Sequence, residues 1–339
     1  EDKEYLDLIL NEGAKKPVDI DESSYEITLP EWFDEAKFKR AQQYFRNNFF
    51  AMFTAKLSGL IAILAVPTIL DILIFTKQSG TSLTAYKRYI ATIFHTLNWY
   101  LVELKPGSKS WSSIEKVRRG HVNVSNRSNK NNVGIISQKD MAITQFGFVG
   151  FIILKANLLG VQETREDMDA LVHFWRTIGY LIGIEDKFNI CTDKLETTIP
   201  RLQMVLSQIL RPGLIAKRKE FLDMTRALVE GLWCFNPFLR TEVALYFTYR
   251  LADVPTYHYW DNENKNEQSR LESLKIIRSL CLQYRLILFC MISVHQILLN
   301  YALFRFYYNN QLHVSRFLIT YFPYLAFYKF GIRHAYVRI

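Results

Sequence analysis

Glycine and proline are scarce in this chain of 339 residues, which contains only 14 and 9 copies of them. A domain built from many short strands needs these residues at its turns, so their scarcity argues against an all-β fold. Cysteine is rarer still. The four cysteines show neither CxxC spacing nor a dense framework, and we expect free thiols in a reducing or cytosol-facing environment.

Several common catalytic motifs are missing. No glycine-rich phosphate loop precedes a helical segment, which excludes the ordinary nucleotide-dependent enzymes. No GxSxG motif suggests a serine hydrolase. HExxH is absent, and no two of the seven histidines are four residues apart. A bound metal ion would therefore take its protein ligands from single histidines on separate helices. This pattern favours a cofactor that itself supplies most of the ligands of the metal, such as haem.

Acidic residues are absent from the end of the chain. None follows Glu272, whereas residues 273–339 carry eight of the nine net positive charges. Thirteen of the thirty-nine residues from 301 to 339 are aromatic. These cations are scattered among apolar residues rather than gathered in a polar arm. This pattern favours an anionic membrane surface over nucleic acid as the partner.

A run without Lys, Arg, Asp or Glu, Leu286–Phe304, lies in this region. Its nineteen residues could just cross a bilayer. The polar side chains of His295, Gln296 and Asn300 would then need hydrogen-bond partners inside the hydrocarbon core of the membrane. An interior helix of a large bundle is the alternative. We favour a peripheral membrane contact of the aromatic tail over a span.

Helical signals dominate the rest of the sequence, of which 49% is hydrophobic. Ser137 with Asp140, and Thr164 with Asp167, form capping signatures ahead of two helical segments. The segment "NVSNRSNKNNVG", residues 123–134, is expected to form a polar loop. Strand-like alternation is scarce, so the sequence predicts an all-α fold.

The predicted organisation has one large helical domain. Residues 1–30 are expected to form an irregular acidic segment. Residues 31–339 are expected to form a single helical bundle, in which residues 273–339 are the basic, aromatic end. No repeat or linker divides the chain further.

Three predicted helices carry candidate site residues, and the last of them places His173 and Arg176 three residues apart. Arg88 and Thr92 are four residues apart, so they share a face with His95, one turn further on. His121 follows Ile114 and Val117 at helical spacing and should turn toward the protein interior. An inward histidine is either a hydrogen-bonded core residue or a ligand. Taken singly, each candidate has a structural explanation.

Four segments contain such candidates in a fixed order: "YKRYIAT", "SIEKVRRGHVNV", "ISQKDMAITQFGFVG" and "HFWRTIGYLIGIED". Together they resemble the latex clearing protein (rubber oxygenase) and MpaB family, over roughly residues 50–250. The resemblance implies an all-helical fold around a b-type haem and a buried tunnel for an isoprenoid chain. It also implies an oxygenase that uses O2 to cleave or oxidise a carbon–carbon double bond, and a membrane location at the endoplasmic reticulum. The cytoplasmic face, or a soluble cytoplasmic protein, is the alternative location.

The resemblance also implies roles for single residues. His121 becomes the ligand of the haem iron, with Arg88 and Thr92 as pocket and catalytic residues. The other implied cofactor contacts are Thr144, Phe148 and His173. The arginines that adjoin His121 could meet haem propionates or the protein surface.

The chain departs from the rubber-cleaving members at two positions. Ala91 stands where they have a basic lysine, and Ile72 stands where they have a pocket glutamate, sixteen residues before Arg88. The neighbouring Asp71 could substitute as the catalytic base. These departures leave two further hypotheses: a haem- or lipid-binding helical protein without oxygenase turnover, and a membrane-associated scaffold without a cofactor.

Overall fold

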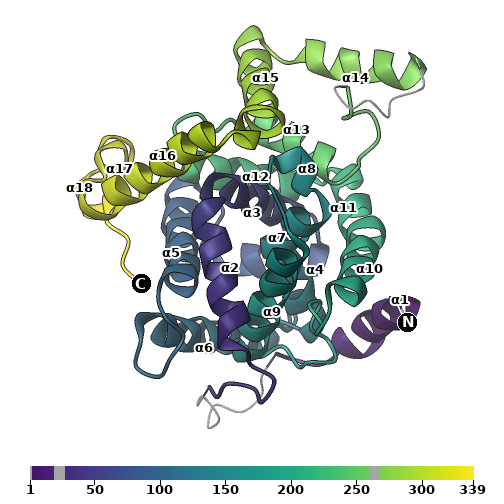
Figure 1. The fold of residues 1–339 in the computed structure, drawn as a ribbon, viewed down its shortest axis with the longest axis vertical. Coiled ribbons are helices and arrows are strands. Elements are labelled where there is room, and N and C mark those ends of the chain that lie inside the picture. The colour runs from purple at the N-terminus through teal and green to yellow at the C-terminus, as the bar shows by residue number, and fades with distance from the viewer. Residues whose placement is uncertain (1, 19–26, 260–266) are drawn as a thin grey trace.

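The computed structural model describes residues 2–18, 27–259 and 267–339. Within these ranges every regular element is a helix, apart from one isolated bridge between Pro17 and Ser137. The predicted all-α fold is therefore confirmed (Figure 1). All four cysteines are free, as expected.

The elements in chain order are α1 (Asp2–Leu8), η1 (Ile9–Gly13), α2 (Glu35–Asn47), α3 (Phe49–Leu64), α4 (Pro67–Thr76), α5 (Ser82–Leu101), α6 (Lys109–Lys130), α7 (Gln138–Leu154), α8 (Ala156–Leu159), α9 (Arg165–Leu181), α10 (Leu195–Val205), η2 (Leu206–Leu210), α11 (Arg211–Ala216), α12 (Lys219–Leu232), α13 (Thr241–Leu251), α14 (Glu267–Ser279), α15 (Leu282–Gln296), η3 (Leu298–Asn300), α16 (Ala302–Tyr321), α17 (Tyr324–Phe330) and α18 (Ile332–Ala335).

Helices α3 and α7 form the centre of the bundle. Both are buried along almost their whole length, which is why their sequences are apolar on all sides rather than along one stripe. They cross at Gly59 and Gly147, where a Cβ atom added to Gly59 would lie 2.0 Å from the carbonyl oxygen of Gly147. The two backbones can touch here because Gly59 has no side chain; a Cβ atom on Gly147 would be less crowded, at 3.2 Å from a methyl carbon of Ile63.

The capping predictions for α7 and α9 are confirmed. The Ser137 hydroxyl accepts the Asp140 N–H, and the Asp140 carboxylate accepts from the backbone of Ser137, a reciprocal capping box. Thr164 caps α9 by accepting the N–H of Asp167. These local hydrogen bonds set where each helix begins.

The loop predicted over residues 123–134 is wrong for most of its length, because α6 continues to Lys130. Val122, Ser125 and Ser128 are buried at three-residue spacing on one face of the extended helix. The Ser128 hydroxyl donates to the carbonyl of Ser125, so these small polar residues are accommodated inside the helix.

The irregular segment predicted over residues 1–30 begins with a helix instead. Tyr5 and Ile9 are buried, and the Tyr5 hydroxyl donates to the carbonyl of Phe188 at 2.9 Å. A short helix is unstable by itself in water, and this tertiary contact stabilises the acidic segment as a helix. Residue 1 and residues 19–26 lie outside the described part of the chain.

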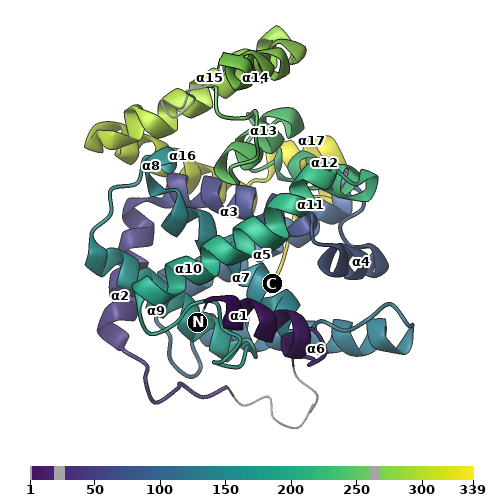
Figure 2. The same cartoon turned by 90° about the vertical axis from the view of Figure 1, so that its right-hand side faces the viewer.

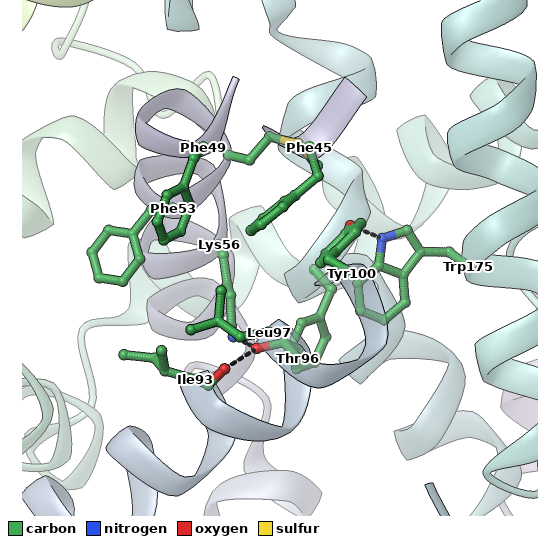
Figure 3. A pocket seen from close by; sticks show the side chains of 11 residues that line it. Phe45, Phe49, Phe53, Lys56, Ile93, Thr96, Leu97, Tyr100 and Trp175 are labelled. Carbon is green, nitrogen blue, oxygen red and sulfur yellow. Dashed lines mark hydrogen bonds between the residues drawn. The ribbon is translucent and has the colours of Figure 1, made fainter. Parts of the chain in front are cut away.

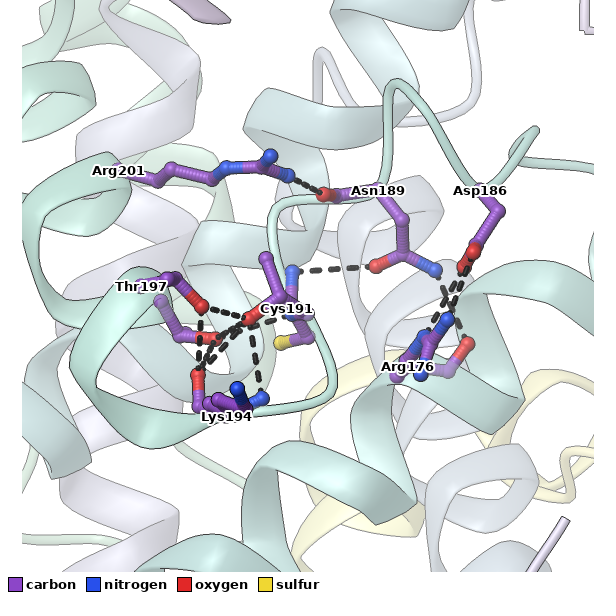
Figure 4. A network of polar contacts seen from close by, with 9 residues as sticks. Arg176, Asp186, Asn189, Cys191, Lys194, Thr197 and Arg201 are labelled. Carbon is purple, nitrogen blue, oxygen red and sulfur yellow. Dashed lines mark hydrogen bonds and ion pairs between the residues drawn. The ribbon is translucent and has the colours of Figure 1, made fainter. Parts of the chain in front are cut away.

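The connection from α9 to α10 is held by a polar network (Figure 4). Arg176 makes a two-point ion pair with Asp186, at 3.0 and 2.7 Å. The Asn189 side chain donates to the carbonyl of Arg176, and Arg201 donates to the carbonyl of Asn189. The network orders this connection and fixes the end of α9, which contributes to the site described below.

The C-terminal helices α14–α18 lie along one side of the bundle, where α14 and α15 project from it (Figures 1 and 2). Among the described residues, one helical stretch, Leu282–Asn300, is long and apolar enough to cross a membrane, and 22% of its 18-residue apolar window is buried. It is therefore not the interior helix that we considered. Near the end of this stretch, Nδ1 of His295 donates to the carbonyl of Leu159 at 3.0 Å, whereas its Nε2 is buried without a partner. Helices α2 and α3 pass the same test only if the two, which are bent by 96°, are taken as one span.

The crossing of α3 and α7 generates a stability prediction. We expect Gly59→Ala to lower the free energy of unfolding by about 3 kcal/mol, because its methyl group collides with backbone that cannot yield. The control is Gly120→Ala in α6, where an added Cβ meets nothing within 4 Å. It should raise stability by about 0.5–1 kcal/mol through helix propensity. Equal effects in urea unfolding would contradict the close crossing.

Candidate functional site

A cavity of about 430 Å³ lies among helices α3, α4, α5, α6, α7 and α9. Its volume falls within the range of roughly 300–1,000 Å³ that is usual for small-molecule and cofactor sites. Most of its wall is aliphatic or aromatic. The lining residues that can ionise or hydrogen-bond through their side chains are Gln78, Arg88, Tyr89, Thr92, His95, Trp99, Lys116, His121, Asp140, Thr144, Gln145 and Trp175.

The structure brings five of the seven predicted site residues to this one cavity: Arg88, Thr92, His121, Thr144 and Phe148. They come from α5, α6 and α7. Arg88 and Thr92 on α5 are four residues apart and share one helix face, and the same is true of Thr144 and Phe148 on α7. Their chemical roles stay predictions.

Among the described residues, His121 is the histidine that lines the cavity with a buried, unpaired ring nitrogen. Burial lowers the pKa of His95, His121, His173 and His295 to about 4. One ring nitrogen of His95 is bonded to a hydroxyl, one of His173 to a backbone N–H and Nδ1 of His295 to a carbonyl. The buried Nδ1 of His121 has no hydrogen-bond partner; the same is true of Nε2 of His295, but His295 does not line the cavity. Since buried polar atoms are normally paired, the His121 nitrogen is free to meet a ligand.

The charge state of His121 suits a ligand role. Its pKa is lowered first by burial and then by the positive charge of Arg88 and the proximity of His95. The imidazole is therefore neutral at pH 7, the form in which a ring nitrogen can bind a metal ion.

Arg88 brings a second unusual group to the cavity. Its Nη1 donates to the hydroxyl of Thr76 at 3.3 Å, and no carboxylate pairs with it among the described residues. Burial lowers the pKa of its guanidinium. A buried cation without a counter-ion is costly, and an anionic group in the cavity would offset that cost.

Sequence reasoning missed part of the wall. Asp140 was recognised only as a helix cap, although its carboxylate also lines the cavity and accepts from Thr68 at 2.5 Å. Gln145 and Trp175 were not singled out; they are linked by a hydrogen bond of 2.6 Å from the Gln145 amide to the Trp175 carbonyl. Both lie in the segments that carry the family resemblance, and this membership is the signal in the sequence that could have indicated them.

His95 reaches the cavity one turn beyond Thr92, as its spacing indicated. Its Nδ1 lies 2.7 Å from the hydroxyl of Ser113, which also accepts the indole N–H of Trp99. This pairing holds the His95 ring in place. His95 is therefore a poorer candidate than His121 for binding a metal.

Asp71 and His173 are not brought to the cavity. Asp71 is exposed, whereas the adjacent Ile72 lines the cavity, because successive helix residues point about 100° apart. Nε2 of His173 accepts the backbone N–H of Asp34 at 3.0 Å, and its ring packs against Phe33. Asp71 therefore has no access as a base, and His173 acts here as a structural residue.

The arginines next to His121 are also outside the lining. Arg118 donates to the carbonyl of Leu181 at 3.4 Å, and Arg119 is exposed. Arg88 and Lys116 are the cations that do line the cavity among the described residues. An anionic substituent of a bound cofactor would find its counter-ion there.

These observations test whether the residues fit a haem. The cavity has an apolar wall, one neutral imidazole with an unpaired nitrogen and one buried guanidinium without a counter-ion. A haem needs an axial ligand, an apolar cleft and partners for its carboxylates. The residues present fit such a group.

Comparison with known proteins identifies the family of the chain and a solved structure with the same fold. Residues 42–247 match the family model described as "ER-bound oxygenase mpaB/B'/Rubber oxygenase, catalytic domain". No curated protein matches the chain. The chain is similar to a solved structure titled "Structure of Latex Clearing Protein LCP in the closed state", with 16% identity and a TM-score of 0.56. The match covers 94% of this chain and 89% of that one, and at this identity it shows a shared fold.

The lowered pKa of His121 predicts a pH dependence. A histidine that titrates near 4 when folded and near 6.5 when unfolded takes up a proton on unfolding between those values. Acidification from pH 7 to 5 should therefore lower the free energy of unfolding less in His121→Leu than in the wild type. Urea unfolding at both pH values measures this. Equal losses would show that His121 is not held neutral.

Proposed function

Because the chain belongs to the ER-bound oxygenase mpaB/B'/rubber oxygenase family, we propose that it is a haem b-dependent oxygenase. Its substrate is an apolar, isoprenoid-like chain, and O2 is the co-substrate. The observation that carries the proposal is the unpaired Nδ1 of a neutral His121 in the wall of an apolar cavity of about 430 Å³.

In this proposal His121 ligates the iron, and Arg88 pairs with a carboxylate of the cofactor. Thr144 and Phe148 supply further contacts. When bound, haem b would supply the redox chemistry with O2, and the cleaved double bond would give two carbonyl products. The protein's own task is to bind and orient both reactants.

The cavity wall performs that task by excluding water and binding an apolar chain. Leu60, Ile63 and Ile69 give it aliphatic surface, and Trp99 and Trp175 add aromatic surface. Such a wall binds hydrocarbon through burial and keeps water from the reacting centre.

Proton transfer by the wall is restricted. The Thr92 and Thr144 hydroxyls donate to carbonyls of their own helices, at 3.0 and 2.7 Å. Asp140 is held by Ser137 and Thr68. The described lining residues therefore offer no carboxylate that is free to act as a base.

That restriction favours one alternative, a haem- or lipid-binding protein that has lost turnover. The exposed position of Asp71 and the presence of Ala91 motivate it. The two hypotheses differ in one measurement. Under O2, an oxygenase converts squalene-like or farnesyl-type chains into aldehydes, whereas the binding protein leaves them unchanged.

The ligand assignment predicts a spectrum. Purified wild-type protein supplied with haem should show a Soret band, and His121→Ala should lose most of it. His95→Ala is the matched control, because His95 lines the same cavity but is bonded to Ser113, and it should retain the band. A full Soret band in His121→Ala would reject His121 as the ligand.

We also propose that the protein contacts a membrane peripherally, at the endoplasmic reticulum or another cytoplasm-facing surface. Helices α15–α18 expose many large apolar side chains, among them Leu303 at 75%, Phe306 at 70% and Tyr328 at 87%. The cations Arg316 and Lys329 lie among them, and no acidic residue follows Glu272. Aromatic residues with interspersed cations suit an anionic lipid interface.

Vesicle flotation tests this contact. We expect the protein to bind vesicles containing phosphatidylserine and to be released in part by salt, because charge contributes. The double variant Leu303→Ser/Phe306→Ser should bind at least about tenfold more weakly, since each buried side chain contributes about 1.5–3 kcal/mol. Leu10→Ser/Ile215→Ser, which also changes exposed apolar residues, should bind normally. Equal binding of both variants would exclude the α15–α18 surface.

A further inference from the structure

A long substrate needs more space than the cavity offers beside a cofactor. About 430 Å³ is the size of a site for one small molecule, so a chain bound next to haem would extend out of it. A small void behind Phe148 and Trp175 offers only about 20 Å³, enough for about one water molecule (Figure 3). Lys56 lines this void, donates to the hydroxyl of Thr96 and has no carboxylate partner among the described residues. The void cannot take the chain.

A much larger cleft, of about 700 Å³, adjoins the cavity. It lies between α5, the start of α6 and α16. His95 and Lys116 line both the cleft and the cavity. Lys116 is exposed although it lines the cavity, so the cavity reaches the surface beside it. An exposed lysine side chain changes rotamer freely, and a chain that lies in the cleft can therefore extend past Lys116 into the cavity.

The cleft is positively charged. Lys109, Lys116 and Arg316 line it, whereas no aspartate or glutamate side chain does. None of these three cations pairs with a carboxylate among the described residues. The long helix α6 begins at Lys109, so the positive end of its dipole also lies at the cleft. Cations at a helix N-terminus favour an anionic ligand, and phosphate in particular.

The cleft also has apolar surface for a chain next to such an anionic end. Phe94 and Leu101 contribute from α5, and Phe317 and Tyr321 contribute from α16. Phe317 and Tyr321 are 51% and 60% exposed, and they belong to the α15–α18 surface that we propose contacts a membrane. An amphipathic molecule held at a membrane surface would therefore meet the cleft directly.

We propose that this cleft binds the phosphorylated end of the isoprenoid-like substrate, whose chain extends past Lys116 into the cavity. Lys109 and Arg316 bind the phosphate oxygens. The inference rests on the proposed function for the nature of the chain and adds its end group, a monophosphate or diphosphate. A membrane phospholipid shares the phosphate but carries two acyl chains, and the experiment separates the two ligands.

Calorimetric titration of the purified full chain tests the proposal, in the absence of O2 and vesicles. A C15 isoprenyl diphosphate should bind at least tenfold more tightly than the C15 alcohol, and added salt should reduce the difference. Equal binding of diphosphate and alcohol would overturn the end-group assignment and leave the oxygenase proposal standing, because no turnover is measured. Inorganic pyrophosphate or dioctanoyl phosphatidic acid that binds as tightly as the isoprenyl diphosphate would also overturn it, as a simple anion site or a lipid site.

A pair of double variants locates the binding site. Lys109→Gln/Arg316→Gln removes two cations that line the cleft but not the cavity, and it should weaken the diphosphate at least tenfold and the alcohol less than twofold. The matched control, Arg127→Gln/Lys130→Gln, removes two exposed cations from the other end of α6 and should bind as the wild type does. Equal weakening by both would show only a general attraction to a basic protein and would overturn the proposal. The comparison of ligands on the wild type decides the matter if a variant fails to fold.

Photolabelling follows the path of the chain. An isoprenyl diphosphate with a diazirine at its far end should label α3 or α7, which line the cavity. Labels confined to α16–α18 would show that the chain does not enter the cavity and would overturn the proposed path.

Discussion

An imidazole nitrogen without a protein partner, inside an apolar cavity, is the constraint on which the proposed activity depends. Desolvation of His121 keeps its ring neutral, and the helices around it supply no hydrogen bond to Nδ1. A protein that needed only stability would pair this atom or replace the residue. The Arg88 guanidinium, in the wall of the same cavity, bonds to the Thr76 hydroxyl but has no carboxylate partner among the described residues, which adds a second cost. Both costs fall where a ligand could offset them.

The bundle can maintain such a cavity because its centre is rigid. Helices α3 and α7 touch backbone to backbone at Gly59 and Gly147, and each is buried over almost its full length. The same two helices carry Lys56, which lines the small void, and Phe148, which lines both the void and the cavity. Close packing thus sets the size of both spaces.

The C-terminal helices α14–α18 differ from the central bundle in the surface that they expose. They add little to the core and expose aromatic and aliphatic side chains with interspersed cations. A water-soluble surface rarely exposes so many large apolar side chains on neighbouring helices without a partner. A peripheral lipid contact would also bring an isoprenoid-like substrate, which partitions into membranes, close to the protein that is proposed to oxidise it.

Local patterns in the sequence determined the helices, the caps at Ser137 and Thr164, and the inward face of His121, because these depend on neighbours within a few residues. Only the tertiary structure decided that α6 continues to Lys130, since burial against other helices overrides the preference of small polar residues for loops. It also decided that Ile72 rather than Asp71 reaches the cavity, and that Lys56 has no counter-ion. Which of two neighbouring residues faces the cavity depends on how the helix is rotated about its axis. Whether a buried lysine has a counter-ion depends on residues that are distant in the sequence. Local spacing determines neither.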